Sequence, residues 1–285
     1  MTDEVGKKKK RKPTIKSKKT SVRIRPFEHR LLTLIFPTLL FICGIGILLW
    51  PKPKYAMSRV SAHIYNLFQE VEPHPIGDRI AFWSAHILED PELLTALGSG
   101  PEINDTVPLF NATYDCTTYV ETVGALARSQ SDKDLAEKLV SIRYRNGLIS
   151  YETRNHFPEA DWIPNNESSG NLTDITLQIS RKAGFTASFV NKDIDKVAWF
   201  SSRTVASVKE SESIVTVKLA YIPLKKIQMS LTHIPQGAVI NIVHVDQDRY
   251  PVLISHQGFL IWKNGMPYFR HASRNRRIAE IPFAD

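Results

Sequence analysis

The sequence is poor in cysteine. Its 285 residues contain two cysteines, Cys43 and Cys116, and they do not have the paired spacing of a zinc site. The chain also lacks internal repeats, and its prolines and glycines are scattered, with no second linker. We therefore expect one folded domain, with no metal and no cofactor.

Net charge is absent from most of the chain, although the total is +8 at pH 7. Residues 1–30 hold 12 lysines and arginines against three acidic residues, whereas residues 31–285 hold 25 against 26. A basic chain suggests a nucleic-acid partner, but here the excess charge is confined to one end, so we expect no nucleic acid. The segment 1–30 has few apolar residues and repels itself, which predicts a disordered tail.

Charge is also missing from "LLTLIFPTLLFICGIGILLW", residues 31–50. Twenty residues span about 30 Å as a helix, which matches the hydrocarbon core of a bilayer and predicts one transmembrane helix. The positive-inside rule places the tail 1–30 in the cytoplasm. Residues 51–57 contain two prolines and two lysines and are predicted to form a short linker, with residues 58–285 on the outer side of the membrane.

A cleavable signal peptide is the alternative for the same segment. Its apolar region is usually shorter and ends at a small-x-small site. Here "WPKPKYAMS" places Lys54 three residues before the bond that follows Ala56. We therefore favour an uncleaved anchor in the cytoplasmic membrane, with a periplasmic or other extracytoplasmic domain.

The second cysteine lies in "NATYDCTTYVETVGAL", residues 111–126. Cys43 is in the predicted span and Cys116 is outside it, so the two cannot form an intramolecular disulfide. Asp115 is suited to cap a helix that begins at Cys116, and the free N–H groups of such a helix favour a thiolate. The same helical stripe also turns the cysteine inward, so a small core residue remains an equal alternative from this segment alone.

The first half of the folded part has helical periodicity, and the second half is rich in β-branched and aromatic residues. Such a division predicts an α+β domain whose helices come first, and not alternating βαβ units. Helices are expected at residues 58–70, 77–90, 116–128 and 132–145, and strands at 185–190, 213–224, 238–245, 251–262 and 267–273.

Two of the nine histidines flank a hairpin signal in "SHQGFLIWKNGMPYFRHAS". Asn264-Gly265 predicts a two-residue turn of the primed type, in which Lys263 pairs with Met266. This register puts His256 and His271 on the same face of the sheet as diagonal neighbours, whereas a three-residue loop would put them on opposite faces. Two ordinary strand histidines remain the alternative.

A cysteine at a helix start, followed by a histidine on one strand and a polar residue on the next, is the order of a papain-like nucleophile, base and orienting residue. The chemistry would be acyl transfer. Cys116 would attack an amide carbonyl, His256 would take and return the proton, and His271 would hold the ring of His256. Gly258 would leave space in front of His271.

The segments "YDCTTYVET", "SHQGFLI" and "FRHAS" resemble, in this order, the motifs of the NlpC-type cell-wall cysteine hydrolases. The block "RYRNGLISYETRNHFPEADWIPNN" resembles one branch of that superfamily, the N-acetylmuramoyl-L-alanine amidases. The resemblance covers about residues 76–285. It implies a papain-like fold, with the helical first half and its cysteine helix packed on an antiparallel sheet. It also implies a peptidoglycan or muropeptide substrate, cleaved between the lactyl group of muramic acid and L-alanine.

The same block is where we expect the substrate to be recognised, because its cations, aromatic rings and hydrogen-bonding groups suit a sugar and a peptide carboxylate. Each of these residues could instead brace a loop or cover the core. Two other functions stay open, namely an endopeptidase that cuts after D-glutamate and a wall-binding protein without activity. The candidate substrate residues are Tyr144, Arg145, Arg154, His156, Asp161 and Trp162.

Overall fold

The computed structural model describes residues 62–89, 114–201, 214–245, 250–273 and 277–283. All of them belong to the compact unit Tyr55–Asp285. The basic tail 1–30, the predicted span 31–50 and the predicted linker 51–57 lie outside the described residues. Within the described ranges, no helix is both long enough and apolar enough to cross a membrane.

Helices dominate the chain before residue 188, as the sequence predicts. Four longer helices agree with the expected ones to within a few residues, and four shorter helices were not predicted. The longer ones are α2 (Ala62–Val71), α3 (Ile76–Glu89), α4 (Cys116–Arg128) and α5 (Asp132–Arg143), and the shorter ones are α6 (Ile163–Ser168), α7 (Thr176–Lys182), α8 (Lys196–Ser201) and α9 (Ile227–Ser230).

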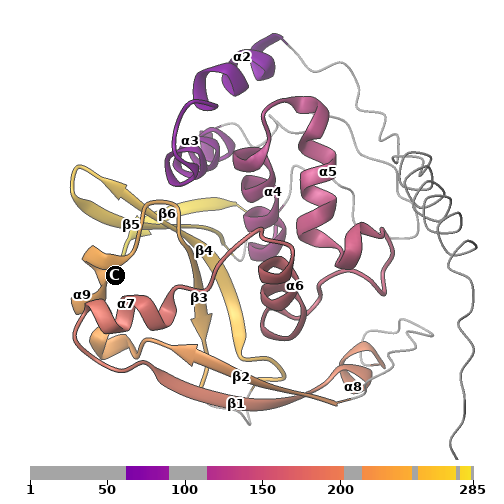
Figure 1. Cartoon of the computed structure of the whole chain (residues 1–285), viewed down its shortest axis with the longest axis vertical. Helices are drawn as coiled ribbons and strands as arrows, with labels where there is room; N and C mark the ends of the chain where they lie inside the picture. Colours follow the sequence, from indigo (N-terminus) through magenta and orange to yellow (C-terminus); the bar gives the residue numbers. More distant parts are fainter. Residues whose placement is uncertain (1–61, 90–113, 202–213, 246–249, 274–276, 284–285) are drawn as a thin grey trace, which may run out of the picture. The chain divides into compact units, whose positions relative to one another are not determined.

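The strands form two antiparallel sheets, which confirms the α+β class (Figure 1). A two-stranded sheet has the order β1-β2, and a four-stranded sheet has the order β3-β4-β5-β6. The five predicted strands are present with shifted ends, and β6 was not predicted. The strands are β1 (Ser188–Asp195), β2 (Ile214–Tyr221), β3 (Val239–Val243), β4 (Ile254–Lys263), β5 (Met266–Ala272) and β6 (Ile278–Pro282).

The β4–β5 hairpin has the register that its turn residues predict. Asn264 and Gly265 both have positive φ, of 50° and 78°, as a primed two-residue turn requires. Lys263 pairs with Met266, and the pairing continues without a shift to Phe259 opposite Arg270. The choice of side chains on each face of this hairpin is therefore set by the turn.

One face of the four-stranded sheet is covered by α4 and α3 (Figure 1). The stripe of α4 that faces the sheet is fully buried, and the ring of Tyr119 packs edge-on against Phe259 of β4, with 5.7 Å between centroids. A buried ion pair joins α4 to α5, because Arg143 Nε donates to Glu121 Oε2 over 2.7 Å. These contacts fix the position of α4 and of the cysteine at its start.

The opposite face of the sheet has its own apolar cluster. Leu260 of β4 lies at its centre, together with Ile179 of α7 and Leu231 and Ile234 of the segment between α9 and β3. Side chains alternate along β4, so Leu260 shares its face with His256, whereas Phe259 points toward the helices. The two histidines are therefore on the sheet face that α4 does not cover.

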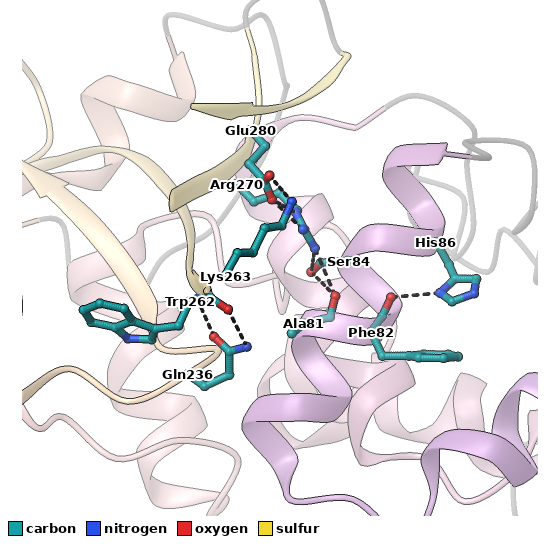
Figure 2. A network of polar contacts seen from close by, with 9 residues as sticks. All are labelled: Ala81, Phe82, Ser84, His86, Gln236, Trp262, Lys263, Arg270 and Glu280. Carbon is teal, nitrogen blue, oxygen red and sulfur yellow. Dashed lines mark hydrogen bonds and ion pairs between the residues drawn. The ribbon is translucent and has the colours of Figure 1, made fainter. Parts of the chain in front are cut away.

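A polar network ties β5 and β6 to α3 (Figure 2). The guanidinium of Arg270 is almost completely buried and donates to the carbonyl of Ala81, at 3.0 Å, and to Ser84 Oγ, at 2.6 Å. Its Nε also donates to Glu280 Oε2 over 2.8 Å. Lys263 reaches the same carboxylate from the protein surface. Arg270 thus neutralises a carboxylate and holds three elements together directly before His271.

Replacing Glu280 by alanine should lower the free energy of unfolding by about 3–5 kcal/mol, because it leaves the buried guanidinium of Arg270 without its carboxylate. Lys263→Ala is the matched control, since it removes the exposed partner of the same carboxylate and should cost about 1 kcal/mol or less. Chemical denaturation of both variants measures the difference. Equal losses would contradict the role assigned to Arg270.

The stability that the Glu280–Arg270 pair provides depends on pH, and the direction follows from the pKa shift of Glu280. Burial opposes ionisation of Glu280, but the hydrogen bonds and charges of Lys263 and Arg270 outweigh it, so the pKa of Glu280 is lowered. A carboxyl with a lowered pKa stabilises the fold above its ordinary pKa of 4.5 and loses that contribution as the pH falls through the folded-state pKa. The difference between Glu280→Ala and the unsubstituted protein should therefore shrink in acid.

Candidate active site

Cys116 is the first residue of α4, as the sequence predicts. Asp115 has extended backbone angles and its carboxylate accepts from the N–H of Thr118 at 2.7 Å. The Thr118 hydroxyl accepts from the N–H of Asp115 in return, so the two residues form a reciprocal cap. The cap fixes the first turn, and with it the backbone N–H groups around Cys116.

The sulfur of Cys116 lies where β4 and β5 separate. Pairing between these strands ends at Phe259 and Arg270, although β4 continues alongside β3 and β5 continues alongside β6. In this gap the backbone of Gln257 lies close enough to the sulfur to favour its thiolate form and so to lower the pKa of Cys116. The thiol is therefore held next to the residue that follows His256, and the cysteine is not simply a filler of the helical core.

The two predicted histidines are hydrogen-bonded to each other. His256 Nε2 and His271 Nδ1 are 2.7 Å apart, and the two rings are perpendicular. One proton is shared by this contact, so one nitrogen donates and the other accepts. If His256 Nε2 donates, its Nδ1 has the free lone pair that a proton acceptor for a thiol needs.

The charge states of the three side chains differ from those that the helix terminus alone predicts. Burial raises the pKa of the Cys116 thiol, and the hydrogen bond from Gln257 opposes this without outweighing it. Burial lowers the pKa of His256, and the neighbouring His271 lowers it further. Burial likewise lowers the pKa of His271. At neutral pH the site therefore holds a thiol and two neutral imidazoles, instead of a preformed thiolate.

Phe269 supports His271 from the same strand. Their rings are stacked, with 4.9 Å between centroids and 17° between planes. A Cβ at Gly258 would lie 2.6 Å from the ring of Phe269 and 2.7 Å from the carbonyl oxygen of Arg270. The glycine thus makes room for Phe269, which in turn holds His271, and this is a different reason for the glycine from the one expected.

A cavity of about 1110 Å³ opens beside this stack. Phe269 is part of its wall, which is mostly apolar and is formed by residues of α3, α4, α6, α7, β2 and β3 and of the segments between them. Among the six predicted substrate residues, Trp162 lines the cavity. The volume is sufficient for a ligand of several hundred daltons. The wall includes Val120 and Gly124 of α4, and Phe269 links the cavity to the histidine pair.

Three of the predicted substrate residues have accessible side chains. Arg145 is exposed, and the guanidinium of Arg154 lies 5.1 Å from the ring centre of Tyr151. His156 is half-buried and its Nε2 is 2.6 Å from the carbonyl oxygen of Tyr151. The structure thus gathers Arg154 and His156 around one aromatic ring, at the end of the block that packs against α8.

The other three predicted residues are buried. Tyr144 belongs to the main core and pairs with Arg154 in an isolated β-bridge. The carboxylate of Asp161 accepts from Lys196 Nζ at 2.6 Å, and Trp162 is 3 % exposed. A direct contact between Asp161 and a substrate would have to break this ion pair. Substrate contact by all six residues stays a prediction.

Sequence reasoning missed two polar residues next to the cysteine, Thr117 and Gln257. Thr117 Oγ1 donates to Gln257 Oε1 over 2.9 Å, and Gln257 Nε2 donates to Asn241 Oδ1 over 2.8 Å. Gln257 is fully buried. The sequence signal that could have identified Gln257 was its position directly after His256, as a polar residue on the face of the strand that otherwise buries Phe259 and Ile261.

An α+β fold with a cysteine at a helix start and a hydrogen-bonded histidine pair on the sheet that the helix covers defines a class of candidate thiol enzymes. Solved structures share the fold. A protein from Legionella pneumophila of the DUF1460 family is 29% identical, with a TM-score of 0.66, over 79% of this chain and 87% of that chain. An N-acetylmuramoyl-L-alanine amidase from Bacteroides uniformis is 23% identical, with a TM-score of 0.56, over 73% and 91% of the two chains. Among curated proteins, none matches this chain.

The family is identified by a match over most of the chain. Residues 83–285 fit the AmiA-like family, described as N-acetylmuramoyl-L-alanine amidase-like, and the chain belongs to this family. The amidase branch expected from the motifs is thereby confirmed at the level of the family. The wider NlpC resemblance and its papain-like fold stay predictions.

Proposed function

We propose that this protein is a peptidoglycan amidase that cleaves the amide between the lactyl group of muramic acid and L-alanine. The observation that carries the proposal is the 2.7 Å hydrogen bond between His256 and His271, next to Gln257, which contacts the first turn of the Cys116 helix. Membership of the amidase-like family supports the choice of bond. The three residues are proposed as nucleophile, base and orienting group in a papain-like arrangement.

The first half-reaction begins from neutral groups. The thiol proton of Cys116 passes to Nδ1 of His256 as the sulfur attacks the carbonyl carbon of the lactyl amide. The proton then moves from His256 to the nitrogen of L-alanine, and the carbon–nitrogen bond breaks. The products are a thioester on Cys116 and a stem peptide with a free amine.

Hydrolysis of the thioester completes the cycle. A water molecule gives a proton to His256 Nδ1 and attacks the thioester carbonyl, and the proton returns to the departing sulfur. The lactyl carboxyl group is released and loses its proton to solvent, and the thiol of Cys116 is regenerated. His271 Nδ1 accepts a hydrogen bond from the Nε2–H group of His256 throughout, which keeps the base in the correct tautomer.

Backbone amides are proposed to stabilise the oxyanion. The N–H of Cys116 lies in the capped first turn of α4, where backbone donors have no partner within the helix. The cavity beside Phe269 is proposed to hold the muropeptide, with Trp162 in its wall and the exposed Arg145 and half-buried Arg154 outside it. We also propose that residues 31–50 anchor the enzyme, with its catalytic domain outside the cytoplasmic membrane.

Digestion of purified muropeptides by the full-length chain in detergent, followed by mass analysis, tests the proposal. The expected products are an intact stem peptide with a free L-alanine amine and a sugar with a free lactyl carboxylate. A disaccharide-dipeptide would identify the D-glutamyl endopeptidase instead. Binding of muropeptides without any cleavage would favour the wall-binding protein and contradict the amidase.

A further inference from the structure

We propose that Gln257 is the residue that positions the thiol of Cys116, by clamping the first turn of α4 to β3 and β4. The inference rests on the proposed function, because it assigns Gln257 a part in the same reaction. Gln257 touches Cys116 through its backbone and Thr117 through its side chain. It acts through these neighbours and not on the substrate.

The clamp joins three elements that are far apart in the sequence. Thr117 belongs to α4, Gln257 to β4, and Asn241 to β3, where it is paired directly with Gln257. Both polar atoms of the Gln257 amide are used, with its oxygen accepting from Thr117 and its nitrogen donating to Asn241. A buried amide with both partners in place is rigid, because losing either contact leaves an unpaired polar group.

The direction of these hydrogen bonds determines what Thr117 can do for the thiol. Its hydroxyl has one proton, and Gln257 Oε1 takes that proton. The oxygen of Thr117, 3.9 Å from the sulfur of Cys116, can then act only as an acceptor for the S–H group. The backbone of Gln257 meanwhile lies close enough to the sulfur to lower the pKa of Cys116.

Gln257 thereby sets the orientation of the thiol twice. Its side chain holds Thr117, and with it the first turn of α4, against β4, and its backbone favours the negative charge that forms on the sulfur when the proton leaves. The alternation of β4 lets the same dipeptide place His256 on one face and this clamp on the other. A shift of α4 by a fraction of an ångström would separate the sulfur from Thr117, from the backbone of Gln257 and from the base.

The test uses the full-length chain with Cys43→Ser, so that Cys116 is the remaining thiol. Thr117→Val removes the hydroxyl at nearly constant volume, and Gln257→Met removes both amide contacts while keeping the backbone N–H. Each should lower kcat on muropeptides about 10- to 100-fold, with KM changed less than about threefold. Each should also slow alkylation of Cys116 by iodoacetamide and shift its pH profile.

The double variant Thr117→Val/Gln257→Met should lose little more than either single variant, because both break one clamp. Thr117→Ser should restore the alkylation profile to within about threefold. Thr122→Val is the matched control, since this buried threonine of the same helix bonds only to a backbone carbonyl of α4, that of Thr118, at 2.8 Å. It should leave the profile and kcat within about twofold.

Losses that add in the double variant, or equal losses in Thr117→Val and Thr122→Val, would overturn the proposal. The same holds if the alkylation profile does not move in Thr117→Val. Because alkylation needs no substrate, it decides the role of Gln257 even if muropeptides are not cleaved. Failure of cleavage by the unsubstituted protein would count against the proposed function alone.

Discussion

Cys116→Ala should abolish muropeptide cleavage, with a loss in kcat of about 10⁴-fold or more. In the proposed reaction the sulfur forms the thioester, so its removal deletes the step and not merely one contact. The backbone amides of the first turn remain, and they sustain only the weak catalysis that binding and oxyanion stabilisation provide. Product release measured by mass analysis under matched protein concentrations gives the ratio.

Folding must be unaffected for this result to have meaning. Cys116 is half-buried at the start of α4, and the cap formed by Asp115 and Thr118 does not involve its side chain. The thermal midpoint should therefore change little. Cys43→Ser provides the matched control, because it removes the other thiol of the chain and should retain full activity. A Cys116→Ala protein that cleaves as fast as the unsubstituted chain would contradict the thiol mechanism.

The sequence was sufficient for those parts of the site that short-range rules determine. Asp115 is a strong N-cap residue, so the helix start at Cys116 could be predicted to the residue. Asn264-Gly265 allows one turn type, so the register and the shared face of the two histidines followed from it. In each case a single local interaction fixes the structure.

The other features of the site depend on packing between segments that are distant in the sequence. The helix terminus predicts a thiolate, but burial against β4 decides the pKa of Cys116, and burial is not visible in the sequence around it. The same applies to the substrate block. Asp161 looked like a ligand for a substrate, yet its partner is Lys196, 35 residues further along, and that contact exists only after α8 has packed.

The β6 strand was missed for a related reason. Its residues Ile278–Pro282 are few and half-exposed, so they carry little hydrophobic periodicity. Their place is set by Glu280, which binds Arg270 of the neighbouring strand. The pair thus closes the sheet beside His271. Only the three-dimensional structure shows that the side-chain carboxylate of Glu280 supports the strand of the orienting histidine.

The histidine pair leads to the second large effect. His256→Ala should lower kcat/KM about 10³-fold or more, because neither water nor His271 can take the thiol proton with the same geometry. His271→Ala should cost about 10- to 100-fold, since the base remains but loses its fixed tautomer. His271→Asn keeps an acceptor oxygen and should recover part of that loss. Equal activity of His271→Ala and the unsubstituted protein would contradict the orienting role.

The pH profile separates this mechanism from one that starts with a thiolate. Both histidines have a lowered pKa, so they stay neutral and active below their ordinary value of 6.5, and the acid limb of kcat/KM should lie below pH 6.5. The raised pKa of Cys116 keeps the thiol protonated well into the alkaline range. In His271→Asn the neighbouring imidazole that lowers the pKa of His256 is gone, so the acid limb should move to higher pH. A profile from pH 4 to 10 for both proteins measures the shift, and an acid limb that moves downward in His271→Asn would mean that His256 is not the base.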